Sequence, residues 1–175
     1  MAKAKTPRAK TPREYTNKQM GDACEMLVAA EVTLAGVPAL LMPANWPDYD
    51  IIAQPKVGVP QRIYARSRTF KRGGDTFVDF DSTAQFDWWA VVLLPGADQL
   101  GRRIFIIPKD VAEARARRNN PATKWVHYRY VRQDKVAEIF PEYENNFRLS
   151  PTGVPVVPTK PPIPALPSPT VLAGD

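Results

Sequence analysis

The residues best suited to chemistry lie in one stretch, PDYDIIAQPKVGVPQRIYARSRTF, which spans residues 47–70. It is typical of two short strands joined by a turn rich in Gly and Pro. Asp50 opens the first strand, and the second carries Arg62, Tyr64, Arg66 and Arg68 at alternate positions. Alternate residues of a strand share one face. Cationic and aromatic side chains interleaved on one face suit phosphate contacts and base stacking, and the alternative is a solvated face with cation–π pairs.

A helix is predicted before this stretch. Thr16 and Gln19 form a capping box, apolar residues then recur at helical spacing, and Gly36 ends the pattern. Glu25 lies at the flank of the apolar stripe, where a salt-bridged or partly exposed acid is the plainer interpretation. The second face of strand 62–70 carries small residues that suit packing beneath a helix: Ile63, Ala65, Ser67 and Thr69.

The remaining patterns alternate between strand and helix. Strands are expected at 38–43, 49–54, 62–70, 76–80, 88–95, 102–108 and 125–131, and helices at 109–119 and 133–140. This order predicts an α/β or α+β fold with a mixed central sheet flanked by helices. We expect three parts: a basic disordered arm over residues 1–16, one domain over 17–149, and a proline-rich disordered tail over 150–175.

The positive charge is concentrated at the N-terminus. Residues 1–18 hold six Lys and Arg residues against Glu14 alone, so this segment carries +5 of the net charge of +6. The basic residues of the arm itself are Lys3, Lys5, Arg8, Lys10 and Arg13. The arm is interpreted either as a segment that contacts nucleic-acid phosphates or as a solubilising leader.

Composition excludes several classes of site. A single cysteine excludes an internal disulfide, and one cysteine with one histidine excludes a zinc site of the usual ligands. Neither a membrane span nor a secretory signal is predicted, so a cytoplasmic setting is expected. The proline-rich tail is interpreted as a plain linker or as a segment that docks a protein partner.

These motifs resemble those of the PD-(D/E)XK nuclease-like superfamily. GDACEMLVAAEVTLAG is similar to its first helix, with Glu25 at the glutamate position, and PDYDIIA is similar to its second motif, with Asp50 as the metal-binding aspartate. RIYARSRTF stands where the third motif belongs. The resemblance is to archaeal Holliday-junction resolvases and small bacterial endonuclease-like proteins, over residues 17–149. The resemblance implies a restriction-endonuclease-like fold, DNA as partner, and Mg²⁺ held by Asp50 and Glu25.

The third motif departs from the family. Tyr64 stands at the position of the acid or glutamine, and Arg66 at that of the lysine. A tyrosine that stays protonated is a poor Mg²⁺ ligand, and an arginine can hold a phosphate but cannot give up its proton. The aspartates that could supply a missing carboxylate are Asp75, Asp79 and Asp81.

The first hypothesis is therefore a protein that binds nucleic acid, and DNA in particular, with a nuclease-like fold and a degenerate catalytic site. The second is an active Mg²⁺-dependent endonuclease that uses Asp50, Glu25 and Arg66. The third is a non-catalytic interaction or structural protein. The sequence leaves open whether the chain forms a homodimer.

Overall fold

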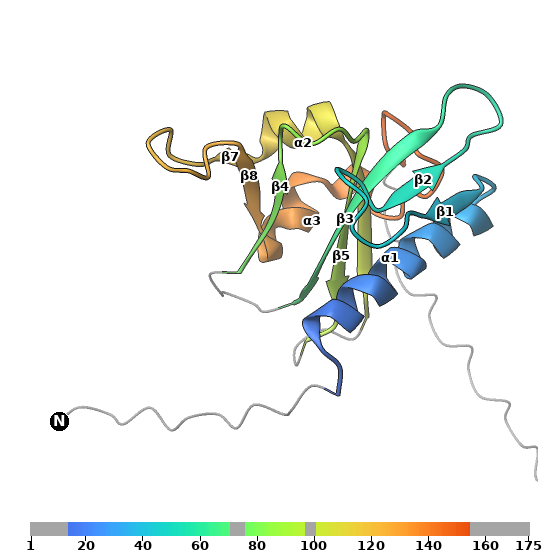
Figure 1. The fold of residues 1–175 in the computed structure, drawn as a ribbon, viewed down its shortest axis with the longest axis horizontal. Coiled ribbons are helices and arrows are strands. Elements are labelled where there is room, and N and C mark those ends of the chain that lie inside the picture. Colours follow the sequence, from blue (N-terminus) through green and yellow to red (C-terminus); the bar gives the residue numbers. More distant parts are fainter. Residues whose placement is uncertain (1–13, 71–75, 97–100, 155–175) are drawn as a thin grey trace, which may run out of the picture.

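The computed structural model describes residues 14–70, 76–96 and 101–154 (Figure 1). The greater part of the expected arm and tail, residues 1–13 and 155–175, lies outside the described residues. The elements in chain order are α1 (Asn17–Leu34), β1 (Ala39–Leu41), β2 (Ile51–Ala53), β3 (Gln61–Thr69), β4 (Phe77–Asp81), β5 (Trp88–Leu94), β6 (Arg103–Pro108), α2 (Lys109–Arg115), β7 (Arg117–Arg118), β8 (Tyr128–Arg132), η1 (Gln133–Lys135), α3 (Val136–Ile139) and η2 (Pro141–Tyr143).

The strands form two sheets. The larger has the order β1-β2-β3-β5-β6, in which β3 and β5 run parallel and the other neighbours run antiparallel. The smaller is antiparallel and has the order β4-β8-β7. The fold is thus mixed α+β with a mixed central sheet flanked by helices, as the sequence predicts.

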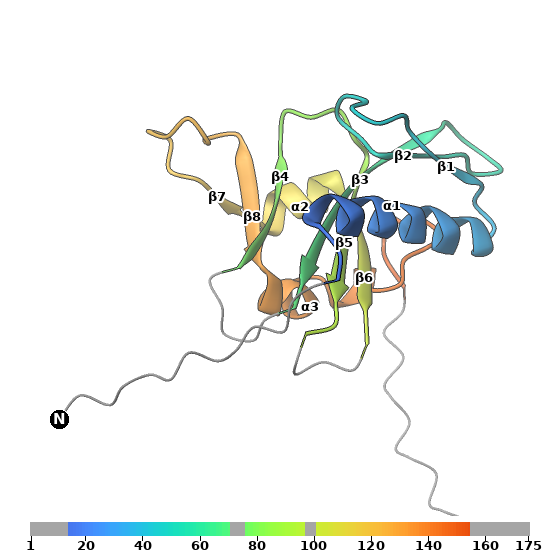
Figure 2. The same cartoon turned by 60° about the horizontal axis from the view of Figure 1, so that its bottom comes forward.

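Helix α1 covers one face of the larger sheet (Figures 1 and 2). Its capping box is present, since Gln19 N donates to Thr16 Oγ1 at 3.2 Å and Thr16 N donates to Gln19 Oε1 at 2.8 Å. Val28 and Val32 of the helix are fully buried in a core that includes Ile63 and Ala65 of β3. The predicted packing of the small face of β3 beneath the helix is confirmed.

The opposite face of the larger sheet is covered by the smaller sheet and the later helices. Strands β5 and β6 contribute side chains to both cores, which explains why their sequences are nearly continuous apolar runs. The second core includes Trp89 of β5, Phe105 of β6, Phe80 of β4 and Phe140, all with no exposed surface. The larger sheet is therefore buried on both faces near its centre.

Three elements differ from the prediction, and one is the helix expected over 133–140, which consists of the 3-10 turn η1 and the short helix α3. The helix expected over 109–119 ends at Arg115, because Ala116 adopts an extended backbone and the next two residues pair with β8 as β7. The strand expected over 125–131 begins only at Tyr128. Pairing of β7 with β8 overrides the local helix preference here.

The C-terminal segment of the described residues is hydrogen-bonded to the larger sheet. Asn146 is fully buried, and its Nδ2 donates to Ile106 O of β6 and Ser150 O, at 3.0 and 2.9 Å. Ser150 N donates back to Asn146 Oδ1 at 2.9 Å, and Val154 N donates to Glu142 O at 2.7 Å. Residues 150–154, the start of the expected tail, thus contact the folded domain. None of the helices within the described residues has the length and apolar character to cross a bilayer.

Candidate functional site

Asp50 is held against the middle of β3. Strand β2 begins at Ile51, opposite Ile63, so the backbone of β2 does not reach Ala65. The carboxylate of Asp50 takes the place of a strand partner there, because Asp50 Oδ2 accepts a hydrogen bond from Ala65 N at 2.7 Å. The position of an aspartate immediately before a short strand therefore fixes its side chain beside β3.

Arg66 lies next to Asp50. Its Nη1 is 3.9 Å from Asp50 Oδ2, which is an ion pair but too long for a hydrogen bond. The guanidinium carbon lies 3.7 Å from the centre of the Tyr64 ring, so the cation stacks on the aromatic face. In the described part of the chain its one hydrogen bond runs from Nη1 to Ala65 O, at 2.8 Å. The side chain is 33% exposed, so the guanidinium remains able to donate to an anion.

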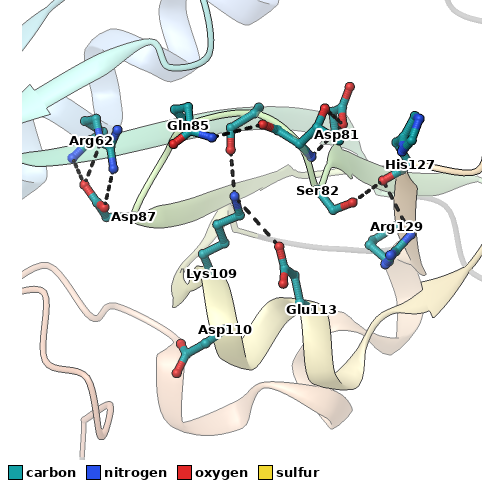
Figure 3. A network of polar contacts seen from close by, with 12 residues as sticks. Arg62, Asp81, Ser82, Gln85, Asp87, Lys109, Asp110, Glu113, His127 and Arg129 are labelled. Atoms are coloured by element: carbon teal, nitrogen blue, oxygen red, sulfur yellow. Dashed lines mark hydrogen bonds and ion pairs between the residues drawn. The ribbon is translucent and has the colours of Figure 1, made fainter.

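The other two arginines of this face are hydrogen-bonded to other residues of the protein. Arg62 holds Asp87 through its backbone N, Nε and Nη2, at 2.8–3.0 Å. Figure 3 shows this pair beside Lys109, which reaches Glu113 of α2. Arg68 donates from Nε to Phe77 O at 3.0 Å and from Nη2 to Asp79 Oδ1 at 3.1 Å. Both arginines therefore join structural elements in the described residues.

Tyr64 is packed inside the protein. It is 8% exposed, and its ring stacks on Phe86 with the centres 5.2 Å apart. The sequence indicates a ring available to bases, whereas the second core covers one of its faces and Arg66 the other. The local alternation of β3 could not indicate this burial, because the covering residues come from later strands.

A cleft opens between α1 and β3, with a volume of about 490 Å³. We call it the α1–β3 cleft; it is lined by Asn17, Met20, Gly21 and Glu25 of the helix, by residues 65–69 of β3, and by Thr76. Glu25 and Arg66, from the first and third motifs, line the same cleft. Asn17 and Gly21 were not predicted as site residues, although the glycine belongs to the helix motif.

The surroundings shift the pKa values of Glu25 in the cleft and of its neighbours Asp50 and Arg66. Burial raises the pKa of Glu25 from 4.5 to about 7, and the negative charges of Asp50 and Asp22 contribute, against the opposing effect of Arg66. Burial also raises the pKa of Asp50, opposed by the Ala65 N–H and by Arg66. Burial lowers the pKa of Arg66, and Asp50 opposes this effect. Near neutral pH the Glu25 carboxyl is thus about half protonated beside the cation of Arg66.

The described side chains do not fit a magnesium site. Mg²⁺ prefers several oxygen ligands, including ionised carboxylates. Asp50 Oδ2 is already bonded to Ala65 N–H and faces Arg66, and Glu25 is about half protonated at pH 7. Over residues 14–70, 76–96 and 101–154, no three His, Cys, Asp or Glu side chains form a cluster that could hold a metal.

The candidate replacement carboxylates do not complete the set. Asp79 pairs with Arg68, and Asp81 Oδ1 accepts from Thr83 N and Oγ1 at 2.8 and 2.6 Å. Asp75 lies outside the described residues, as do the basic residues predicted for the arm: Lys3, Lys5, Arg8, Lys10 and Arg13. Of the predicted site residues, the structure brings together Glu25, Asp50, Tyr64 and Arg66.

No protein-family model and no curated protein matches the chain. Among solved structures, it is similar to a bacterial homing endonuclease, I-Ssp6803I, with 16% identity, a TM-score of 0.47, and coverage of 67% of this chain and 76% of that one. It is also similar to a Holliday junction resolvase of the archaeal hyperthermophile Archaeoglobus fulgidus, with 14% identity, a TM-score of 0.43, and coverage of 70% and 88%. Both are nucleases, the class that the sequence motifs resemble. Similarity of this size carries no argument about activity, which has to come from the side chains of the cleft.

Proposed function

We propose that this protein binds nucleic acid, and DNA in particular, by holding a backbone phosphate on Arg66 in the α1–β3 cleft, without cutting the strand. The preference for DNA follows from the motif resemblance. The observation that carries the proposal is the state of Arg66: Arg62 and Arg68 are bonded to carboxylates, whereas Arg66 is stacked on Tyr64 and keeps guanidinium N–H groups for an anion.

The arrangement suits binding more than hydrolysis. Arginine forms bidentate hydrogen bonds with phosphate, and the Tyr64 ring holds the guanidinium in one orientation. In the free protein Asp50 Oδ2 lies 3.9 Å from Arg66 Nη1 and offsets the charge of the guanidinium. A phosphate can compete with an ion pair of this length. The basic arm, residues 1–16, would add phosphate contacts outside the cleft.

Duplex DNA binding measured by fluorescence anisotropy tests the proposal. Arg66→Ala should weaken binding about 5- to 150-fold, as expected for one charge-assisted contact of about 1–3 kcal/mol. Arg148→Ala is the matched control, because Arg148 is an exposed arginine that does not line the cleft. Equal affinities of the two variants would contradict the proposal.

One observation favours an active Mg²⁺-dependent endonuclease as the second candidate. Glu25 of the cleft and Asp50 are close enough for the charge of Asp50 to raise the pKa of Glu25, so two acids are neighbours beside Arg66. Asp50→Asn separates the two functions, because the amide oxygen can still accept from Ala65 N–H while the charge is lost. A protein that only binds should keep or gain affinity in this variant. An endonuclease should cleave DNA with Mg²⁺ or Mn²⁺ and lose that cleavage in the variant.

A further inference from the structure

A second cavity, rich in aromatic side chains, lies on the smaller sheet. Its volume is about 540 Å³, and we call it the aromatic pocket; it is lined by Phe77, Asp79, Asn119, Trp125, Tyr128 and Tyr130. Trp125 meets Tyr128 edge-on at 5.4 Å, and Phe77 meets Tyr130 edge-on at 5.2 Å. Trp125 is 51% exposed, so its ring is accessible from solution.

Positive charge borders this pocket. Ten of the lysines and arginines in the described residues pair with carboxylates, whereas Arg117 and Lys124 have no ion pair within the described part of the chain. Arg117 is opposite Tyr130 in the β7–β8 ladder, so the two side chains share a face. Lys124 Nζ lies 4.8 Å from the centre of the Trp125 ring. An aromatic pocket with free cations at its border is complementary to a base flanked by phosphates.

The aromatic pocket adjoins the α1–β3 cleft. Thr76 lines the cleft, and Phe77, the next residue in the chain, lines the pocket. Arg68 lines the cleft and is bonded to two pocket residues, to the backbone of Phe77 and to the carboxylate of Asp79. A strand whose phosphate lies on Arg66 therefore has a neighbouring site for one of its bases.

We propose that the aromatic pocket binds an unpaired nucleobase, so that the substrate class is nucleic acid with a bulged, extruded or single-stranded base next to the phosphate held in the cleft. This inference rests on the proposed function, because the phosphate held by Arg66 determines which base of the strand reaches the aromatic pocket. Trp125 stacks on the base, Tyr128 contacts the edge of the base because the two rings meet at 80°, and Arg117 and Lys124 contact the flanking phosphates. Stacking tolerates every base, because each base has an aromatic face, so no strong sequence preference is expected.

The proline-rich segment of this chain is the competing occupant, since such segments dock in aromatic grooves. The charges favour the nucleobase. Residues 155–175 contain Lys160 and a single acid, Asp175, so they carry little charge complementary to Arg117 and Lys124, whereas a nucleic-acid strand brings a phosphate for every nucleotide.

The experiment compares a labelled blunt duplex with the same duplex carrying one unpaired base at its centre. Full-length Trp125→Ala should lose about 5- to 100-fold in affinity for the bulged duplex and keep the wild-type affinity for the blunt one. Trp46→Ala is the matched control, because Trp46 is also an exposed tryptophan, 46% exposed, that meets a tyrosine edge-on. Its affinities should equal those of the wild type.

The outcomes separate this inference from the proposed function. If Arg66→Ala weakens blunt-duplex binding but Trp125→Ala behaves like Trp46→Ala on both probes, the nucleobase pocket is refuted and the phosphate site stands. If Arg66→Ala is neutral while Trp125→Ala still loses bulged-duplex affinity, the phosphate site is refuted and the pocket stands. Wild-type protein that binds neither probe refutes both. A synthetic peptide of residues 155–170 that quenches Trp125 fluorescence, with no response to the bulged duplex, assigns the pocket to the proline-rich segment and overturns the inference.

Discussion

Replacing Glu25 with glutamine should remove a pH-dependent loss of folding stability. The pKa of Glu25 is about 7 in the folded protein and 4.5 ordinarily. Below pH 4.5 the group is protonated in both states. Between pH 4.5 and 7 the unfolded chain loses the proton while the folded protein keeps it, so stability falls as pH rises and the loss is complete above about pH 8. The pKa difference corresponds to at most ~3.4 kcal/mol, which solvent screening of this half-buried side chain reduces to about 1–2 kcal/mol.

Urea denaturation followed by tryptophan fluorescence at pH 5 and pH 8 measures this effect. The free energy of unfolding of Glu25→Gln should exceed that of the wild type by about 1–2 kcal/mol more at pH 8 than at pH 5. Glu14→Gln controls for the loss of one negative charge, because Glu14 is exposed just before α1. DNA affinity should follow the same pattern, since ionised Glu25 repels phosphate in the cleft. Wild-type and Glu25→Gln proteins whose stabilities stay parallel from pH 5 to 8 would refute the reasoning.

Three further predictions concern the metal site, the C-terminal segment and the arm. The double variant Tyr64→Glu/Arg66→Lys should bind divalent metal, so its melting temperature should rise when Mn²⁺ is added. A melting temperature that does not change with Mn²⁺ would contradict this. Asn146→Ala should destabilise the fold by about 2–4 kcal/mol in urea denaturation, because it leaves the buried Ile106 O and the part-buried backbone N and O of Ser150 without this partner. A cost below about 1 kcal/mol would contradict this prediction. Deleting residues 1–14 should reduce the slope of DNA affinity against salt concentration, and an unchanged slope would exclude phosphate contacts by the arm.

Local patterns were sufficient to predict most elements of the fold. The capping box of α1 depends on residues three positions apart, and the apolar runs of β5 and β6 reflect burial on both faces. The smaller sheet was not predicted, because β4 pairs with a strand some fifty residues later in the chain. The helix that starts at Lys109 was predicted to be too long, because residues 117 and 118 pair with β8 instead of continuing the helix.

The candidate site was predictable where strands adjacent in sequence determine the positions of its residues. Asp50 lies beside β3 because β2 and β3 form a hairpin, so its proximity to Arg66 follows from local sequence. The different bonding of the three arginines of β3 does not follow from local sequence. Their partners, Asp87 and Asp79, belong to later segments, and only the tertiary structure distinguishes the stacked Arg66 from its two bonded neighbours.

The path of β4 has a consequence for how the protein folds. The chain leaves the larger sheet after β3, forms β4 in the smaller sheet, and returns as β5 to pair with β3. The central parallel pair of the larger sheet therefore encloses a strand whose own partner, β8, comes much later in the chain. Neither sheet can be completed before most of the domain has been synthesised, so the native contacts have high contact order and slow folding is expected. The two sheets should also protect their amides from hydrogen exchange as one cooperative unit.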